Sequence, residues 1–164
     1  MTRGQVKNPK DCHERALGLL AVRPRSRQEL ERRLSAAGFP EGEVADVLGR
    51  LEGVGLIDDR AFAAQLAAHH FDNKRSGSRA VASALASKGV SRVVSDEILK
   101  GADRDDPERA FQLAAAKAVR LHDLPREKAY TRLVGLLARR GYGPGVAREA
   151  ARRALEVEEA DDGA

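Results

Sequence analysis

The sequence predicts an all-α protein in which three tandem three-helix repeats form an elongated, curved array. One observation is an apolar skeleton that recurs with identical spacing and ends on a glycine. Its three copies are Leu30, Leu34, Gly38, Phe39; Val81, Leu85, Gly89, Val90; and Leu133, Leu137, Gly141, Tyr142. A period near 50 residues indicates stacked units rather than one closed core. The other observation is composition: aromatic residues make up 4% of the chain, and alanine, leucine, arginine and glutamate dominate, as in helical proteins.

The first repeat is predicted over residues 13–57, after a basic N-terminal segment (1–12) whose Asn8–Pro9 pair opens the first helix. Ser26 and Glu29 form a capping box at the start of the second helix. The third helix is indicated by one apolar stripe with helical spacing. The stripe consists of Val44, Val47, Leu48 and Leu51.

The second repeat is predicted over residues 58–102. Asp58 or Asp59 caps its first helix, which carries Phe62, and Ser91 opens its third helix. Between these two helices, a polar stretch that contains Gly77 ends the first helix before the second helix begins.

The third repeat is predicted over residues 107–156. Asp106–Pro107 is a cap followed by a proline, and Pro125 and Pro144 begin the next two helices. An acidic tail, residues 157–164, completes the chain. Neither it nor the basic N-terminal segment belongs to a repeat.

Most recurring positions have a structural interpretation. Leucines at helical spacing form the core, glycines accept the left-handed conformation that ends a helix, and the paired aspartates cap a helix. The structural positions are Leu34, Gly38, Asp58, Asp59, Phe62, Gly77, Leu85, Gly89, Leu137 and Gly141.

Charge and cysteine content narrow the functional classes. The chain carries a net charge of +4, and leaving out the five acidic residues of 156–164 raises this to +9 for residues 1–155. A basic body favours a polyanionic or acidic partner. The single cysteine, Cys12, excludes an internal disulfide and favours a cytoplasmic setting. No apolar run approaches the roughly 20 residues of a membrane span, so we expect no membrane partner.

A nine-residue segment at the boundary between the first two repeats reads Gly55-Leu56-Ile57-Asp58-Asp59-Arg60-Ala61-Phe62-Ala63. It resembles a signature of the RecX family of bacterial recombination regulators. Three other stretches resemble further motifs of that family in the same order. They are Arg23–Leu30 with Gly38–Phe39, then Lys74–Val90, and then Lys117 with Leu137–Tyr142. The resemblance covers about residues 13–155. The chain departs from the family pattern at two places. Val81 stands where isoleucine is usual, and Pro144–Gly145 stands where a polar helix start is usual.

The resemblance implies a protein that is not an enzyme and that binds RecA, above all the RecA filament on single-stranded DNA. It implies inhibition of the recombinase, ATPase and co-protease activities of RecA, and so modulation of DNA repair and the SOS response. The implied fold is an array of three-helix repeats. No cofactor or metal is expected, and the repeat has no obvious dimer seam, so we expect a monomer.

Basic side chains are the candidates for contact with RecA or directly with single-stranded DNA. Those of the first repeat are Arg25, Arg27, Arg32 and Arg33. Those of the second are Lys74, Arg75, Arg79, Lys88 and Arg92, and those of the third are Arg132, Arg139 and Arg140.

The sequence raises two other classes of function, a DNA-binding module and an enzyme or metal site. Residues 30–51 superficially resemble a helix-turn-helix, so a basic helical module acting directly on DNA is the alternative. An enzyme or metal site finds little support, because the adjacent His69 and His70 point about 100° apart on a helix and do not readily share one ion. The chain also lacks a glycine-rich phosphate loop and a nucleophile motif.

Overall fold

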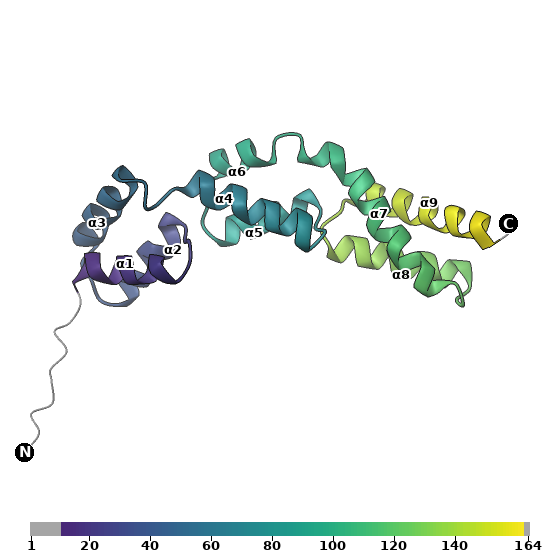
Figure 1. Ribbon diagram of the computed structural model, residues 1–164, viewed down its shortest axis with the longest axis horizontal. Coiled ribbons are helices and arrows are strands. Elements are labelled where there is room, and N and C mark those ends of the chain that lie inside the picture. The colour runs from purple at the N-terminus through teal and green to yellow at the C-terminus, as the bar shows by residue number, and fades with distance from the viewer. Residues whose placement is uncertain (1–10, 163–164) are drawn as a thin grey trace, which may run out of the picture. The chain divides into compact units, whose positions relative to one another are not determined.

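The structure is a computed structural model that describes residues 11–162, so Asn8 and Pro9 of the expected first helix start lie outside the described residues. Nine α-helices and no strand occur in this range, which confirms the all-α class. They are α1 (Cys12–Val22), α2 (Arg27–Ala36), α3 (Glu41–Gly53), α4 (Asp59–Ala68), α5 (Ser78–Ser87), α6 (Arg92–Leu99), α7 (Asp106–Ala118), α8 (Arg126–Arg139) and α9 (Pro144–Asp162) (Figure 1). In chain order they make three groups of three.

The chain divides into two compact units. Unit 1 comprises the described residues up to Phe62 together with Lys88–Val90, and unit 2 comprises the remaining described residues.

Unit 1 has its core between α1, α2 and α3. The helices bury one stripe each because their apolar residues follow the helical period. The buried core residues are Cys12, Ala16, Leu30, Leu34, Val44, Val47, Leu48, Leu51 and Ile57. The stripe predicted for the third helix is therefore entirely buried. Phe39 packs against the same core after the turn at Gly38.

The helix starts of unit 1 use the side chains that the sequence indicates, with one difference. The Ser26 hydroxyl accepts a hydrogen bond from the Glu29 backbone N–H at 3.1 Å, as an N-cap does. The Glu29 carboxylate, which we expected to complete a capping box, accepts hydrogen bonds from Arg23 and Arg25 instead. Two arginines offer this carboxylate charge-assisted hydrogen bonds, which are stronger than a bond to one backbone amide.

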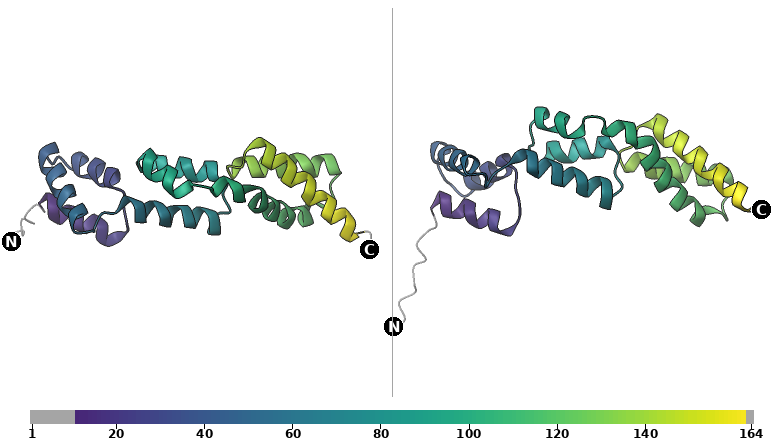
Figure 2. Two further views of the ribbon diagram at one scale, coloured as in Figure 1. Left: turned by 90° about the horizontal axis from the view of Figure 1, so that it is seen from above. Right: turned by 45° about the horizontal axis from the view of Figure 1, so that its top comes forward.

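Unit 2 contains the largest core, formed by α7, α8 and α9, which lie side by side in all views (Figures 1 and 2). Alanines on α7 and α9 let these two helices approach closely, and Leu133 and Leu137 of α8 are buried against them. Helix α9 continues to Asp162, so residues 157–162 of the expected acidic tail are helical. Pro125 and Pro144 lie at the starts of α8 and α9, as predicted.

The remaining part of unit 2 joins α4 to α5. Helix α4 runs directly into a π-helical turn, His69–Asn73, and a short loop then leads to α5, which packs on α6. Helix α7 begins at Asp106 rather than after it, and no side chain caps it. The expected cap at Asp106 is therefore wrong, because this carboxylate accepts hydrogen bonds from Ser78 and Arg109 instead.

Candidate partner-binding surface

The arginines of the first repeat make internal ion pairs. Arg25 is buried, its Nε donates to the carbonyl of Leu19 at 3.0 Å, and its Nη1 lies 2.5 Å from the Glu29 carboxylate. Arg23 and Arg33 bind the same carboxylate. Burial by itself raises the pKa of Glu29, but the hydrogen bonds and charges of Arg23 and Arg25 outweigh it and hold this pKa below its ordinary value. Arg25 therefore fastens α1 to α2 and offers little surface to a partner.

The other two candidates of the first repeat are also engaged within unit 1. Arg27 lies 2.9 Å from Glu52 and 3.7 Å from Glu31, and Arg32 donates to the side chain of Gln28 at 3.0 Å. Exposed ion pairs are weak and exchange readily with water or a ligand. Arg27 and Arg33 thus reach solvent with part of their charge already balanced, whereas Arg32 contacts a neutral amide.

Unit 2 gathers four candidates from three chain segments. Lys74 and Arg75 belong to the loop before α5, Arg79 to the first turn of α5, and Arg140 to the end of α8. Arg140 donates from Nη1 to the carbonyl of Lys74, and the Arg79 guanidinium lies against Gly143, where an added Cβ would be 3.3 Å from its Nη2. We call these four residues the cationic cluster. The sequence alone had placed them in two different repeats.

The loop of the cationic cluster is held by backbone and side-chain bonds. The N–H of Gly77 donates to the carbonyl of Arg140 at 2.7 Å, and the hydroxyl of Tyr142 donates to the carbonyl of Arg75 at 3.0 Å. Gly77 is required here because an added Cβ would lie 2.5 Å from the carbonyl oxygen of Gly141. The cluster is thereby built on a fixed backbone.

Arg75 has an unusual backbone conformation, with φ at +49°. Glycine adopts this left-handed region at lower cost than a residue with a long side chain. Non-glycine residues in such conformations gather at functional sites. This conformation makes Arg75 a candidate functional residue of the loop.

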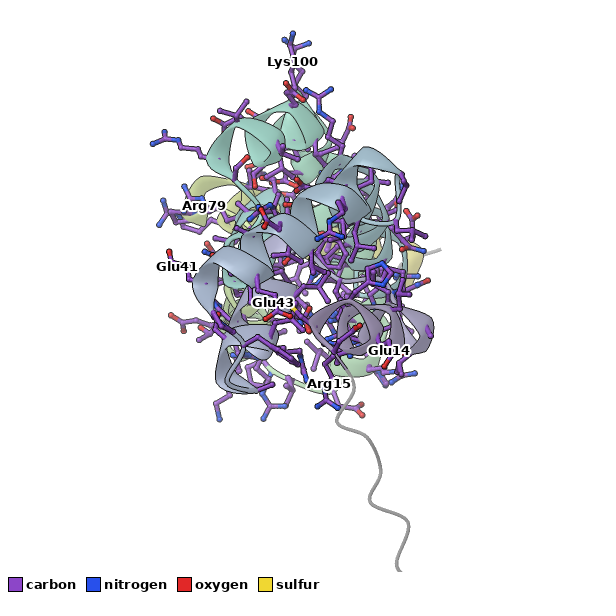
Figure 3. All side chains as sticks on the ribbon, turned by 90° about the vertical axis from the view of Figure 1, so that its left-hand side faces the viewer. Glu14, Arg15, Glu41, Glu43, Arg79 and Lys100 are labelled. Atoms are coloured by element: carbon purple, nitrogen blue, oxygen red, sulfur yellow. The ribbon has the colours of Figure 1, made fainter. Side chains whose placement is uncertain are left out.

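One buried acidic group near this loop, Asp106, is neutralised internally. Asp106 is buried and accepts hydrogen bonds from Ser78 and from Arg109, whose guanidinium also lies 4.4 Å from the centre of the Phe71 ring. Among the residues that the structure describes, Lys74, Arg75 and Arg79 make no ion pair with an acidic side chain. Figure 3 shows Arg79 at the surface. The cationic cluster can therefore bind carboxylates or phosphates of a partner.

The remaining candidates are not members of this cluster. Lys88 accepts a hydrogen bond from the Ser26 hydroxyl through its backbone carbonyl, and Arg92 is almost fully exposed, 3.7 Å from Asp96. Arg132 and Arg139 line a groove between α7 and α8. The structure thus brings together four of the predicted residues, Lys74, Arg75, Arg79 and Arg140.

The histidine pair shows no arrangement for metal binding. The rings of His69 and His70 are perpendicular, with their centres 6.1 Å apart. Burial lowers the pKa of His70, and the neighbouring Lys74 and His69 lower it further. Within residues 11–162, no three histidine, cysteine, aspartate or glutamate side chains gather where an ion could sit. Chemically, the charged side chains of the described surface offer ion pairing.

Two models of the RecX family match the chain: the first three-helix domain matches residues 12–51, and the second matches residues 58–99. The regulatory protein RecX of Mycolicibacterium smegmatis is 42% identical over 156 residues, which cover 87% of this chain and 81% of that protein. The chain belongs to the RecX family. The regulatory protein RecX of Streptomyces coelicolor is 38% identical over 158 residues, covering 93% of this chain and 84% of that protein.

Solved structures of RecX proteins share the fold. The crystal structure of RecX from Lactobacillus salivarius superposes with a TM-score of 0.77 at 19% identity and covers 89% of this chain and 95% of that one. A second crystal structure of a regulatory protein RecX gives a TM-score of 0.70 at 24% identity, covering 82% and 68% of the two chains. No helix in the described range has the length and apolar character needed to cross a membrane.

The two aspartates of the RecX signature have different partners. Asp58 accepts a hydrogen bond from the N–H of Ala61 at 3.0 Å and so caps α4. Asp59 accepts one from the N–H of Arg27 at 2.9 Å, at the first turn of α2. The sequence left open which of them caps the helix, and it carried no signal for the second bond because 32 residues separate Asp59 from Arg27. The sequence carried no signal for the bond between the Ser78 N–H and Asp106 for the same reason, since 28 residues separate them.

Proposed function

We propose that this RecX-family protein binds RecA and the RecA filament on single-stranded DNA, and that it inhibits the recombinase, ATPase and co-protease activities of RecA. In the cell, this inhibition modulates DNA repair and the SOS response, and the protein acts without enzymatic activity of its own. The observation that carries the proposal is the 42% identity to a regulatory protein RecX over most of both chains. The resemblance of the ordered motifs over residues 13–155 supports it.

The cationic cluster is our candidate for the main contact. Its four side chains come from a loop and two helix ends whose backbones are fixed, so little backbone conformational entropy is lost when they bind. One exposed ion pair contributes little, but several that form together on one partner add up. Arg25 is left out of this contact set because it is buried. Arg27, Arg32 and Arg33 remain secondary candidates.

Inhibition follows from differential binding. A ligand shifts an equilibrium between conformations only by binding one of them more tightly than the others. A regulator that fits one geometry of the RecA filament better than the next slows the conformational cycle that ATP hydrolysis requires. Where it occupies the surface that receives duplex DNA or a repressor, it also excludes these substrates.

The test is RecA-dependent ATP hydrolysis on single-stranded DNA, with this protein titrated into the reaction. We expect inhibition by the wild-type chain and inhibition weakened by about tenfold in apparent affinity for the triple variant K74E/R75E/R79E. The matched control is R15E/K100E/R104E, which reverses three exposed charges outside the candidate set (Figure 3 shows Arg15 and Lys100). Equal inhibition by both triple variants would remove the cluster from the contact. No inhibition by the wild-type chain would contradict the proposed function.

The alternative is a module that acts directly on DNA, and the exposed charge of Lys74, Arg75 and Arg79 favours some phosphate contact. A gel-shift experiment with random single-stranded and duplex DNA, each with and without RecA, separates the two functions. Tight, sequence-selective binding of duplex DNA without RecA would support the alternative. Weak binding that grows when RecA is present would support the proposal.

A further inference from the structure

A groove of about 750 Å³ lies in unit 2, between the end of α7, the following 3-10 turn Val119–Leu121, and α8. Its volume falls in the range of about 300–1,000 Å³ that is typical of ligand-binding clefts. The lining has an apolar part and a charged part, and the hydroxyl-bearing Thr131 lines the groove as well. The apolar part consists of Leu121, Leu133 and Leu136 beside Gly135, and the charged part consists of Lys117, Arg120, Arg132 and Arg139.

Helical spacing places these side chains on the faces that meet at the groove. On α8, Arg132, Gly135 and Arg139 are three and four residues apart and therefore share one face. Gly135 carries no side chain, and an added Cβ would lie 3.2 Å from Nη1 of Arg139. A glycine inside a helix costs about 1 kcal/mol relative to alanine. At this position the glycine leaves open space under the arginine.

The charge of the groove is unbalanced. Four cationic side chains line it, and no acidic side chain does. In the part of the chain that the structure describes, none of the four makes an ion pair with a carboxylate. Like charges gathered beside an apolar surface repel one another, because such a surface screens them less than water does. An anionic ligand would relieve this repulsion.

The apolar part decides between two kinds of anionic ligand. Single-stranded nucleic acids bind with their bases stacked on aromatic side chains, and the groove lining contains no aromatic residue. Leu121 and Leu136 are half-buried and offer contact area to aliphatic side chains instead. A peptide that carries aliphatic side chains on one face and carboxylates at its edges matches both parts of the lining.

We propose that this groove binds an acidic peptide segment with aliphatic side chains, contributed by the protein partner. The proposal deepens the proposed function and rests on it for the identity of that partner. Leucine or isoleucine side chains of the segment lie on Leu121 and Leu136. Its carboxylates pair with Lys117 and Arg120 on one side and with Arg132 and Arg139 on the other.

Fluorescence anisotropy with the full chain and a labelled twelve-residue probe peptide tests this. In the probe, pairs of leucines alternate with pairs of glutamates. One control peptide has serine in place of leucine at the same charge, and one control is a twelve-nucleotide oligothymidine. We expect the leucine probe to bind about tenfold more tightly than either control. Equal binding of the two peptides, or tighter binding of the oligonucleotide, would overturn the proposal.

Two variants locate the binding. R132E/R139E reverses two of the four charges, and Gly135→Met fills the groove while all four charges remain. Each should weaken binding of the leucine probe by about tenfold, whereas K100E/R104E should leave it unchanged. Circular dichroism checks that each variant is folded. Unchanged binding to both groove variants would overturn the proposal.

RecA-dependent ATP hydrolysis, measured with the same proteins, keeps the two proposals separate. Inhibition of RecA by a wild-type chain that does not bind the probe would overturn the groove and leave the proposed function standing. Groove-dependent binding of the probe by a chain that does not inhibit RecA would support the groove and overturn the proposed function. Weaker inhibition by both groove variants would support both.

Discussion

The carboxylate of Asp106 accepts hydrogen bonds from both the backbone N–H and the hydroxyl of Ser78, at 3.1 and 2.5 Å. Asp59 makes the equivalent bond to the N–H of Arg27 at 2.9 Å. In both cases, the acceptor is the first residue of the first helix in one repeat. The donor is the first N–H of the second helix in the preceding repeat. The first N–H groups of a helix lack intrahelical partners and carry partial positive charge, so a carboxylate is favourable there.

A second bond recurs beside the first. The Ser26 hydroxyl donates to the carbonyl of Lys88, and the Gly77 N–H donates to the carbonyl of Arg140. Both donors, Ser26 and Gly77, immediately precede the second helix of a repeat. Both acceptors, Lys88 and Arg140, immediately precede the glycine that ends the second helix of the next repeat. The second helices of the first two repeats, α2 and α5, thus have their starts connected to the next repeat by two polar bonds each.

Substitution of Asp106 by alanine should lower the stability by about 2–4 kcal/mol. The change leaves the Ser78 N–H without its carboxylate and Arg109, which is 23% exposed at its side chain, without its nearest charge partner. The measurement is the free energy of unfolding in urea. Asp105→Ala is the matched control because Asp105 is 73% exposed and lies 3.6 Å from the same arginine. Similar losses in the two variants would show that burial of Asp106 contributes nothing.

Alanine should cost more at Gly141 than at Gly38. Both glycines end a helix with positive φ, +88° and +93°, so each substitution loses about 1 kcal/mol in backbone conformation. At Gly38 an added Cβ meets nothing within 4 Å, whereas at Gly141 it lies 2.4 Å from the Cβ of Ala80. Overpacking should add about 1–3 kcal/mol at Gly141 alone. Equal losses in thermal unfolding would show that the neighbouring backbone moves aside freely.

These two glycines also show where prediction from the sequence ends. The helix stops, the buried stripes and the helical class follow from local spacing, because periodicity and positive φ are properties of short segments. Gly38 and Gly141 look identical in the sequence. Only one of them packs against Ala80, because that contact joins residues 61 positions apart.

The candidate sites were predictable to different degrees. The sequence placed Lys74, Arg75 and Arg79 together because they are neighbours in the chain. Their proximity to Arg140 depends on how α8 ends beside the loop, which no local pattern records. The groove is a further case: Arg132 and Arg139 share a helix face by their spacing, but the space under them depends on Gly135 and on a different helix.

Glu29 should contribute to stability in a pH-dependent way. Its folded-state pKa lies below its ordinary value of 4.5, so its contribution is fully present above pH 4.5 and is lost as the pH falls through the folded-state pKa. We expect Glu29→Gln to lower the melting temperature at pH 7, and we expect the difference from wild type to shrink below pH 4.5. Glu31→Gln, at a more exposed site, is the control. A difference that stays constant from pH 7 to pH 3 would contradict the assignment.

Replacement of Tyr142 by phenylalanine should loosen the cationic cluster while leaving its charges in place. Burial raises the pKa of Tyr142, so its hydroxyl is protonated at neutral pH and donates to the carbonyl of Arg75. Losing this bond should cost about 1 kcal/mol. It should also speed hydrogen exchange at the N–H groups of Lys74 and Ser76, which bond to the carbonyls of His69 and His70.

The same variant links the order of the loop to inhibition of RecA. A loosened loop loses more conformational entropy on binding, so the apparent affinity in the ATPase assay should fall by about fivefold even though no charge has changed. Tyr130→Phe, which removes a hydroxyl from a half-buried tyrosine of α8 outside the loop, should leave both exchange and inhibition unchanged. Faster exchange in Tyr142→Phe with full inhibition would mean that the charges act without a fixed backbone, and the contribution of this tyrosine would then be to stability alone.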